Sequence, residues 1–322
     1  MRGLLAWLLL LVIVLTACDD LERSLLEEDQ AMAGCGTGAP APRALETPFW
    51  PARFRPEPVP DKFVGGYLEH YRDLLPRDLP AEYDLLIFAF ARVGPDGEVI
   101  FDHNQDTAEL QADILRRKVG GSPTLLSIGG AQGAESGLHT RAEQQRLLDG
   151  LIAVIDDYRF SGVDWDIEYG VPDGLSSDGV VAVSRALRQH YGSNFSITLT
   201  PYSHDEIIEA YQDIAGRLRD DLTYVGYQFY NDLESPTVEH VLAVTEHWLS
   251  ACGLDEAQWV LGFVHEDDFQ GHTTSHATMA QIYDAVEDRF PGVRGVWTWG
   301  IADKDAPLGF PFATTMAGHV GG

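Results

Sequence analysis

The sequence predicts an α/β fold in which eight parallel strands close into a (β/α)8 barrel, or TIM barrel. From residue 63 onward, short β-rich runs alternate with amphipathic helical stretches, and the runs recur about every 20 to 40 residues. Eight such units in about 260 residues fit a closed barrel. An open doubly wound sheet favours a glycine-rich phosphate turn after its first strand, whereas Gly65 and Gly66 lie inside the first run.

The predicted elements follow this alternation along the chain. The strands are expected at residues 63–67, 83–93, 124–128, 162–168, 196–200, 223–230, 259–264 and 295–299. Amphipathic helices are expected at residues 108–118, 141–158, 179–190, 237–251 and 279–289. This order predicts one domain over residues 61–322, and no internal repeat is evident.

The fourth predicted strand carries an unusual row of acids. Side chains alternate between the two faces of a strand, so Asp164, Asp166 and Glu168 share one face. The other face presents Val163, Trp165 and Ile167, which suit packing against helices. The acids are therefore expected to point into the barrel, where crowding and burial raise at least one carboxyl pKa. Paired protonated and ionised carboxyl groups are what glycosidic bond cleavage uses.

A less specific interpretation of the same strand is an edge strand with one solvated acidic face. The apolar opposite face and the central place among eight strands favour the interior position instead.

The N-terminal residues are typical of an export signal. Residues 1–17 combine a basic start, an apolar run of about a dozen residues and small residues before Cys18, and the run is shorter than the ~20 residues of a membrane-spanning helix. The tetrapeptide ending at Cys18 resembles a bacterial lipobox, which implies cleavage before Cys18 and lipid attachment to it. The alternative is an ordinary signal peptide with an incidental cysteine. Residues 18–60, rich in Gly, Ala and Pro, are expected to form a flexible tether.

Export implies a location on the outer face of the bacterial cytoplasmic membrane, on the periplasmic side or at the cell surface. In that oxidising compartment Cys35 and Cys252 could pair, and their spacing leaves the question open. The chain has 50 acidic and 22 basic residues and a net charge of −28, which argues against nucleic-acid binding. His272 and His276 lack a third ligand, so neither a metal nor another cofactor is expected. The chain is expected to be a monomer.

Five motifs occur in order along the chain. They are Phe88-Ala89-Phe90, Leu126-Ser127-Ile128-Gly129-Gly130, Ser161-x-x-Asp164-x-Asp166-x-Glu168, Gln228-Phe229-Tyr230-Asn231 and Gly295-Val296-Trp297-Thr298-Trp299. Together they resemble the A-F, S-x-G-G, D-x-x-D-x-D-x-E, Q-F-Y-N and strand-eight patterns of family 18 glycoside hydrolases, which include chitinases and endo-β-N-acetylglucosaminidases. The resemblance spans residues 63 to about 305 and departs at Ser161, which replaces the first acid.

The resemblance implies a role for each matching residue. Glu168 matches the general acid, and Asp166 matches the carboxylate that holds the N–H of the substrate's acetamido group. Asp164 matches the inner acid that tunes Asp166, and Tyr230 matches the hydroxyl that binds the acetamido oxygen. Trp299 matches the floor under the sugar, although Trp297 shares its strand parity and competes for that role.

Further candidates line the expected cleft. Gln228, Asn231, Tyr67, Phe90 and Tyr202 are the predicted substrate-binding residues. The segment His265–Asp268 follows the seventh strand and either touches substrate or is simply solvated.

The resemblance also implies a substrate class and a mode of action. The substrate would be an oligosaccharide or polysaccharide containing β-1,4-linked N-acetylglucosamine, cleaved with retention by participation of its own acetamido group. Chitin oligomers, the chitobiose core of N-glycans and peptidoglycan-derived sugars all stay open as its source. Only about 30 residues separate Val264 from Gly295, which leaves out the small α+β insertion of processive members. We therefore expect an open cleft and endo cleavage. The alternatives are an endo-β-N-acetylglucosaminidase acting on N-glycans and a lectin-like relative that binds glycans without cutting, although such relatives usually lack the terminal Glu.

Overall fold

A computed structural model of the chain describes residues 45–47, 52–131, 133–168, 171, 173–203, 205–230, 236–264 and 274–321. The predicted signal peptide, Cys18 and Cys35 lie outside these residues. Within them, no helix combines the length and apolarity needed to cross a membrane.

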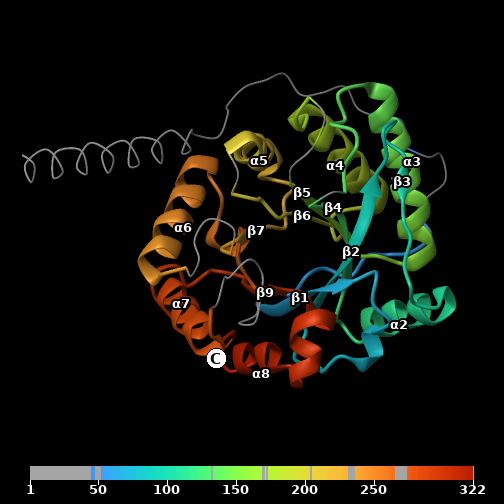
Figure 1. Ribbon diagram of the computed structural model, residues 1–322. Helices are drawn as coiled ribbons and strands as arrows, with labels where there is room; N and C mark the ends of the chain where they lie inside the picture. The colour runs from blue at the N-terminus through green and yellow to red at the C-terminus, as the bar shows by residue number, and fades with distance from the viewer. Residues whose placement is uncertain are drawn as a thin grey trace, which may run out of the picture. The chain divides into compact units, whose positions relative to one another are not determined.

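Eight parallel strands of the described residues close into a barrel, which confirms the predicted fold class (Figure 1). The sheet closes because β1 pairs with β2 on one side and with β9 on the other. A short strand, β3, pairs antiparallel with the end of β2. The strands are β1 (Phe63–Glu69), β2 (Leu85–Val93), β3 (Val99–Ile100), β4 (Thr124–Gly130), β5 (Gly162–Ile167), β6 (Ser196–Leu199), β7 (Tyr224–Gln228), β8 (Trp259–Val264) and β9 (Gly295–Trp299).

Helices surround the barrel, as Figure 1 shows. They are α2 (Thr107–Val119), α3 (Arg141–Tyr158), α4 (Ser177–Tyr191), α5 (Asp205–Leu218), α6 (Val238–Cys252), α7 (His276–Arg289) and α8 (Pro311–Ala317). Short helical turns form η1 (Pro76–Asp78), η2 (Glu256–Gln258), η3 (Ile301–Asp305) and η4 (Ala306–Leu308). Helices α3, α4 and α7 each begin after a capping residue, which is Thr140, Ser176 and Ser275 respectively. The side-chain oxygen of each capping residue accepts a backbone N–H of the first turn that has no partner within the helix.

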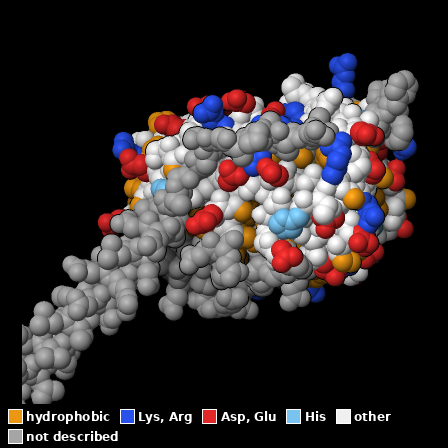
Figure 2. All heavy atoms as spheres, turned by 90° about the horizontal axis from the view of Figure 1, so that it is seen from above, with side chains coloured by type: hydrophobic (Ala, Val, Ile, Leu, Met, Phe, Trp, Pro, Cys, Tyr) orange, Lys and Arg blue, Asp and Glu red, His pale blue; other side chains and the backbone are white. Residues whose placement is uncertain are grey.

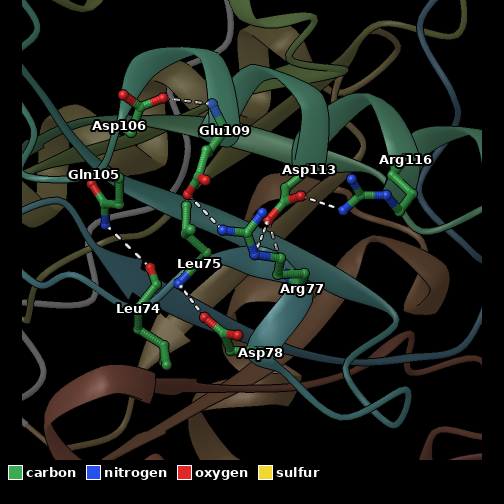
Figure 3. Close-up of polar contacts among 9 residues, drawn as sticks. All are labelled: Leu74, Leu75, Arg77, Asp78, Gln105, Asp106, Glu109, Asp113 and Arg116. Atoms are coloured by element: carbon green, nitrogen blue, oxygen red, sulfur yellow. Dashed lines mark hydrogen bonds and ion pairs between the residues drawn. The ribbon is translucent and has the colours of Figure 1, made fainter.

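The connection between β1 and β2 contains the single turn η1 where a regular unit has an α-helix. Figure 3 shows how polar contacts tie this turn to α2. The backbone N–H of Arg77 donates to the buried Asp113 at 3.3 Å, and Arg116 forms an ion pair with the same carboxylate. The Arg77 guanidinium also pairs with Glu109 at 2.5 Å. These contacts satisfy a buried carboxylate and fix the shortened first unit against the second.

Apolar side chains form two separate cores. One lies between the strands and the helices and includes Val163, Trp165 and Ile167 of β5. The other fills the barrel itself. Its members are Val59, Phe63, Tyr67, Leu85, Ile87, Ala89, Leu125, Tyr224, Tyr230, Val260, Val264 and Trp297.

Two glycines make room for the largest side chain inside the barrel. A Cβ atom on Gly226 would lie 2.3 Å from Nε1 of Trp297, and one on Gly262 would lie 2.2 Å from its Cζ2. The Trp297 ring therefore packs directly on the backbone of β7 and β8, which is possible only where these strands lack side chains.

Residues 52–60 form a segment, here called the strap, that lies against the barrel. The backbone N–H of Glu57 donates to Oγ of Ser161 at 3.2 Å, and Arg294 donates to the Pro60 carbonyl at 3.0 Å. The tether was predicted to extend through residue 60. The strap shows that the folded body begins earlier, because side chains of the barrel satisfy its backbone groups.

Candidate active site

The strand β5 presents its acids as its alternation predicts. Val163, Trp165 and Ile167 lie in the outer core, and Nε1 of Trp165 donates to Oγ of Ser184 on α4 at 2.9 Å. Asp164 and Asp166 are buried on the opposite face, inside the barrel. Glu168 follows at the carboxyl end of the strand, which in this fold opens at the mouth of the barrel.

Four hydroxyl groups surround the carboxylate of Asp164. Tyr67 and Ser127 donate to its Oδ2 at 2.9 and 2.7 Å. Thr198 and Thr200 donate to its Oδ1 at 2.7 and 2.9 Å. Burial raises the pKa of Asp164, and these hydrogen bonds oppose the rise. Neutral donors on β1, on β4 and at the end of β6 thus satisfy the innermost acid.

Asp166 and Glu168 share one amide partner. Nε2 of Gln228 on β7 donates to Oδ1 of Asp166 at 2.8 Å. Burial, followed by the negative charges of Glu168 and Asp164, raises the pKa of Asp166 well above its ordinary value. Burial raises the pKa of Glu168 to about 7, and a hydrogen bond with Gln228 opposes this rise. Glu168 can therefore hold a proton near neutral pH, as a general acid must.

Tyr230 lies close to the same acids. Its side chain is buried, and the pKa of its hydroxyl is raised well above the usual range by burial and then by the charges of Asp166 and Glu168. Its ring contacts Trp297 edge to face, with centroids 6.2 Å apart. Tyr202 follows β6, is partly buried, and adds a smaller electrostatic effect on Tyr230. The structure thus brings Tyr230 close to the acids and Tyr202 close to Tyr230.

Aromatic rings line the opposite side of the barrel mouth. Phe90 and Trp299 stack, with centroids 5.5 Å apart and planes 17° from parallel. Tyr67 contacts Trp299 at 5.6 Å and Trp297 at 4.9 Å. Trp297 is fully buried, whereas Trp299 is partly exposed. Of the two competing tryptophans, only Trp299 keeps surface on which a sugar could rest.

The two glycines at the end of β4 leave space for this arrangement. Gly129 and Gly130 have φ angles of 116° and 79°, in a region that side chains disfavour. A Cβ atom on Gly129 would lie 2.5 Å from the Asp166 carbonyl oxygen, and one on Gly130 would lie 2.6 Å from the Phe90 ring. The Ser-x-Gly-Gly motif thus lets β5 and Phe90 approach β4 closely.

Sequence reasoning missed one buried acid at the mouth. Glu69 ends β1, and strand parity places it on the same face as Tyr67. Its two oxygens accept backbone N–H groups of Ala302 and Asp303, each at 2.9 Å. Strand alternation could have indicated it, because Glu69 is an acid two positions after Tyr67, which faces the barrel interior.

Other predicted residues lie elsewhere. Asn231, His272 and the segment His265–Asp268 fall outside the described residues. His276 is the first residue of α7. Ser161 is fully buried just before β5 and accepts the hydrogen bond from the strap. The described residues contain no group of three or more side chains suited to hold a metal ion.

Comparison with known proteins agrees with this geometry. The curated relatives include chitinase D of Niallia circulans, 26% identical over 204 residues, a match that covers 55% of this chain and 39% of that protein. Endochitinase 4 of Metarhizium robertsii is 22% identical over 276 residues, covering 74% of this chain and 78% of that protein. The chain thus spans about two fifths of the length of the bacterial relative and most of the fungal one.

Solved structures share the fold. A putative chitinase A from Streptomyces coelicolor has a TM-score of 0.70 at 22% identity, covering 80% of this chain and 98% of that one. A family GH18 chitinase from Chromobacterium violaceum has a TM-score of 0.72 at 21% identity, covering 81% and 84%. The family model described as glycosyl hydrolases family 18 matches residues 64–299, which is most of the chain. The protein therefore belongs to glycoside hydrolase family 18.

Proposed function

We propose that this family 18 member is an endo-acting, retaining glycoside hydrolase that cleaves β-1,4 bonds next to N-acetylglucosamine. The observation that supports it most is the row of Asp164, Asp166 and Glu168. The surroundings of these three acids change from the barrel interior toward the mouth. Asp164 is enclosed by hydroxyl groups, Asp166 has one amide donor, and Glu168 has a pKa of about 7. The chitinases among its relatives fit the same substrate class.

In the proposed first step, Glu168 donates its proton to the oxygen of the scissile bond. The acetamido carbonyl oxygen of the bound sugar attacks the anomeric carbon as the bond to the leaving sugar breaks. This forms a cyclic oxazolinium ion. Asp166 accepts a hydrogen bond from the acetamido N–H and stabilises the positive charge, and Tyr230 donates to the acetamido oxygen.

In the second step, the ionised Glu168 takes a proton from a water molecule. The water oxygen then bonds to the anomeric carbon on the face that the leaving group occupied. The oxazolinium ring opens, the acetamido group is restored, and the product retains its anomeric configuration. Glu168 ends the cycle protonated, as it began.

The short connection between β8 and β9 supports the proposed endo mode. Helix α7 occupies 14 of the residues between these strands, so little chain is left to build an additional wall. An open cleft admits the middle of a polymer chain. We also propose that the lipid attached to Cys18 anchors the enzyme outside the cytoplasmic membrane. Loss of membrane association in a Cys18→Ser variant would support this anchor, and unchanged association would contradict it.

The test of the hydrolase is the release of a fluorophore from chitobiose and chitotriose glycosides. The wild-type chain should release it, and Glu168→Gln should reduce the rate by about a thousandfold or more, because no proton donor remains. Glu239→Gln, an exposed acid on α6, serves as the matched control and should keep full activity. On a soluble chitin derivative, viscosity should fall before much reducing sugar appears. Equal rates for wild type and Glu168→Gln would refute the proposal.

A further inference from the structure

Glu69 is a buried acid outside the row on β5. It lies at the mouth end of β1, and its side chain is fully buried. Its carboxylate accepts two adjacent backbone N–H groups, from Ala302 to Oε2 and from Asp303 to Oε1, both at 2.9 Å. These two donors belong to the first turn of η3, which begins two residues after Trp299.

The turn held by Glu69 sets the direction of the chain as it leaves Trp299. Gly300 has a φ of 76°, in the left-handed region, and a Cβ atom there would lie 3.5 Å from Oε1 of Glu69. Ile301, the next residue, is fully buried. Only these two residues separate Trp299 from the first N–H that Glu69 accepts, so movement of the turn is transmitted to the Trp299 backbone.

The Trp299 ring depends on such support because its own packing is one-sided. It stacks on Phe90 and contacts the Tyr67 ring, while part of its surface stays exposed. A partly exposed ring has fewer neighbours to fix its position than a ring buried on all sides. The position of its backbone therefore has a large effect on where the ring lies.

A carboxylate at this place carries a cost that an apolar residue would avoid. Burial, and to a smaller extent the charge of Asp303, raises the pKa of Glu69 to about 7, while the two backbone hydrogen bonds oppose the rise. A carboxylate offers two acceptor oxygens to two neighbouring donors, which a glutamine cannot do because one of its terminal atoms is itself a donor. The residue type thus matches the task of holding both N–H groups.

We propose that Glu69 is a positioning residue for sugar binding, acting through the turn after Trp299 to hold the stacked Phe90 and Trp299 rings in place. This inference rests on the proposed function. It requires that Glu69 and Trp299 act as a unit, so that loss of one removes most of the benefit of the other.

The test is a double-mutant cycle on binding of a chitin hexasaccharide to the Glu168→Gln protein, measured by calorimetry. Adding Glu69→Gln should weaken binding about tenfold, and adding Trp299→Ala should weaken it at least as much. Adding both should match Trp299→Ala within about twofold, because Glu69 has no ring left to position. The matched control is Asp113→Asn, which alters another buried carboxylate that accepts a backbone N–H (Figure 3). It should leave the affinity unchanged even if stability falls.

Each outcome supports or overturns one of the two proposals. Unchanged affinity in Glu69→Gln, or additive effects of the two substitutions, overturns the positioning role while leaving the hydrolase standing. No binding by the Glu168→Gln protein itself overturns the proposed substrate, and the role of Glu69 with it. If Glu69→Gln does not fold, Glu69→Asp takes its place in the cycle, because the shorter side chain cannot reach both donors. It should give the same non-additive loss of affinity with Trp299→Ala. An additive loss would overturn the positioning role.

Discussion

Replacing Glu168 with glutamine should make the protein more stable at alkaline pH while removing its activity. The pKa of Glu168 rises from 4.5 to about 7 in the folded chain because of burial. Between these two values the folded state keeps a proton that the unfolded state releases. Stability therefore falls as the pH rises from about 4.5 to about 7, and the full cost is present above that window.

The size of the effect follows from the same shift. Each tenfold change in proton affinity corresponds to about 1.4 kcal/mol. The rise in the pKa of Glu168 therefore lowers the free energy of unfolding at alkaline pH by at most about 3 kcal/mol. Glu168 keeps some exposure at the mouth, and water screens part of this cost, which leaves about 2 kcal/mol. For a chain of this size, that amounts to an increase in Tm of roughly 3 to 4 °C.

The assay is thermal unfolding of wild type and Glu168→Gln at pH 8 and at pH 4.5, with the same scan rate. The variant should unfold at the higher temperature at pH 8 and close to wild type at pH 4.5. Glu143→Gln is a control of opposite sign, because hydrogen bonds from Thr140 lower the pKa of Glu143. It should lose stability at pH 8. A Glu168→Gln protein with the same Tm difference at both pH values, or with a lower Tm at pH 8, would refute the reasoning.

Two further substitutions test the packing that supports the site. Gly262→Ala would place a Cβ atom 2.2 Å from the Trp297 ring. It should therefore lower the free energy of unfolding by about 2 to 3 kcal/mol and reduce activity. In the same denaturant-unfolding measurement, the surface substitution Gly318→Ala serves as the control and should be nearly neutral. Ser161→Ala removes the acceptor for the Glu57 N–H, so it should cost about 1 kcal/mol with activity retained, and an inactive Ser161→Ala protein would show that this position matters to catalysis.

The strands were predictable because their pattern is local. All eight barrel strands were placed within a few residues, and the largest differences lie at strand ends. The fourth strand was expected to include Glu168, but β5 ends at Ile167. The sixth was expected to reach Tyr230, but β7 ends at Gln228, where the chain turns. The alternation of apolar and polar residues locates a strand well but its last residue poorly. Where a strand ends depends on its hydrogen bonds with the neighbouring strand, which the pattern does not show.

The row of acids on β5 was predictable for the same reason, whereas its partners were not. The hydroxyl groups around Asp164 come from β1, β4 and the end of β6, and the closed barrel brings them together. Glu69 was missed because its partner Ala302 lies 233 positions away in the sequence. The strap was mistaken for tether because its prolines suggest disorder, while its contact with Ser161 spans 104 positions. Long-range hydrogen bonds leave no periodic signal in a sequence.

Among the residues that the structure describes, the acids Asp164, Asp166 and Glu168 have no basic side chain in an ion pair with them, and this bears on the glycans that the proposed site would accept. The segments 231–235 and 265–273, which follow β7 and β8 in the sequence, contain five acidic residues and no lysine or arginine. Figure 2 shows acidic side chains spread over the surface as well. If the proposed function holds, a sugar bearing its own carboxylate, such as a uronic or muramic acid, would meet electrostatic repulsion from these negative charges, while neutral or amine-bearing glycans would not.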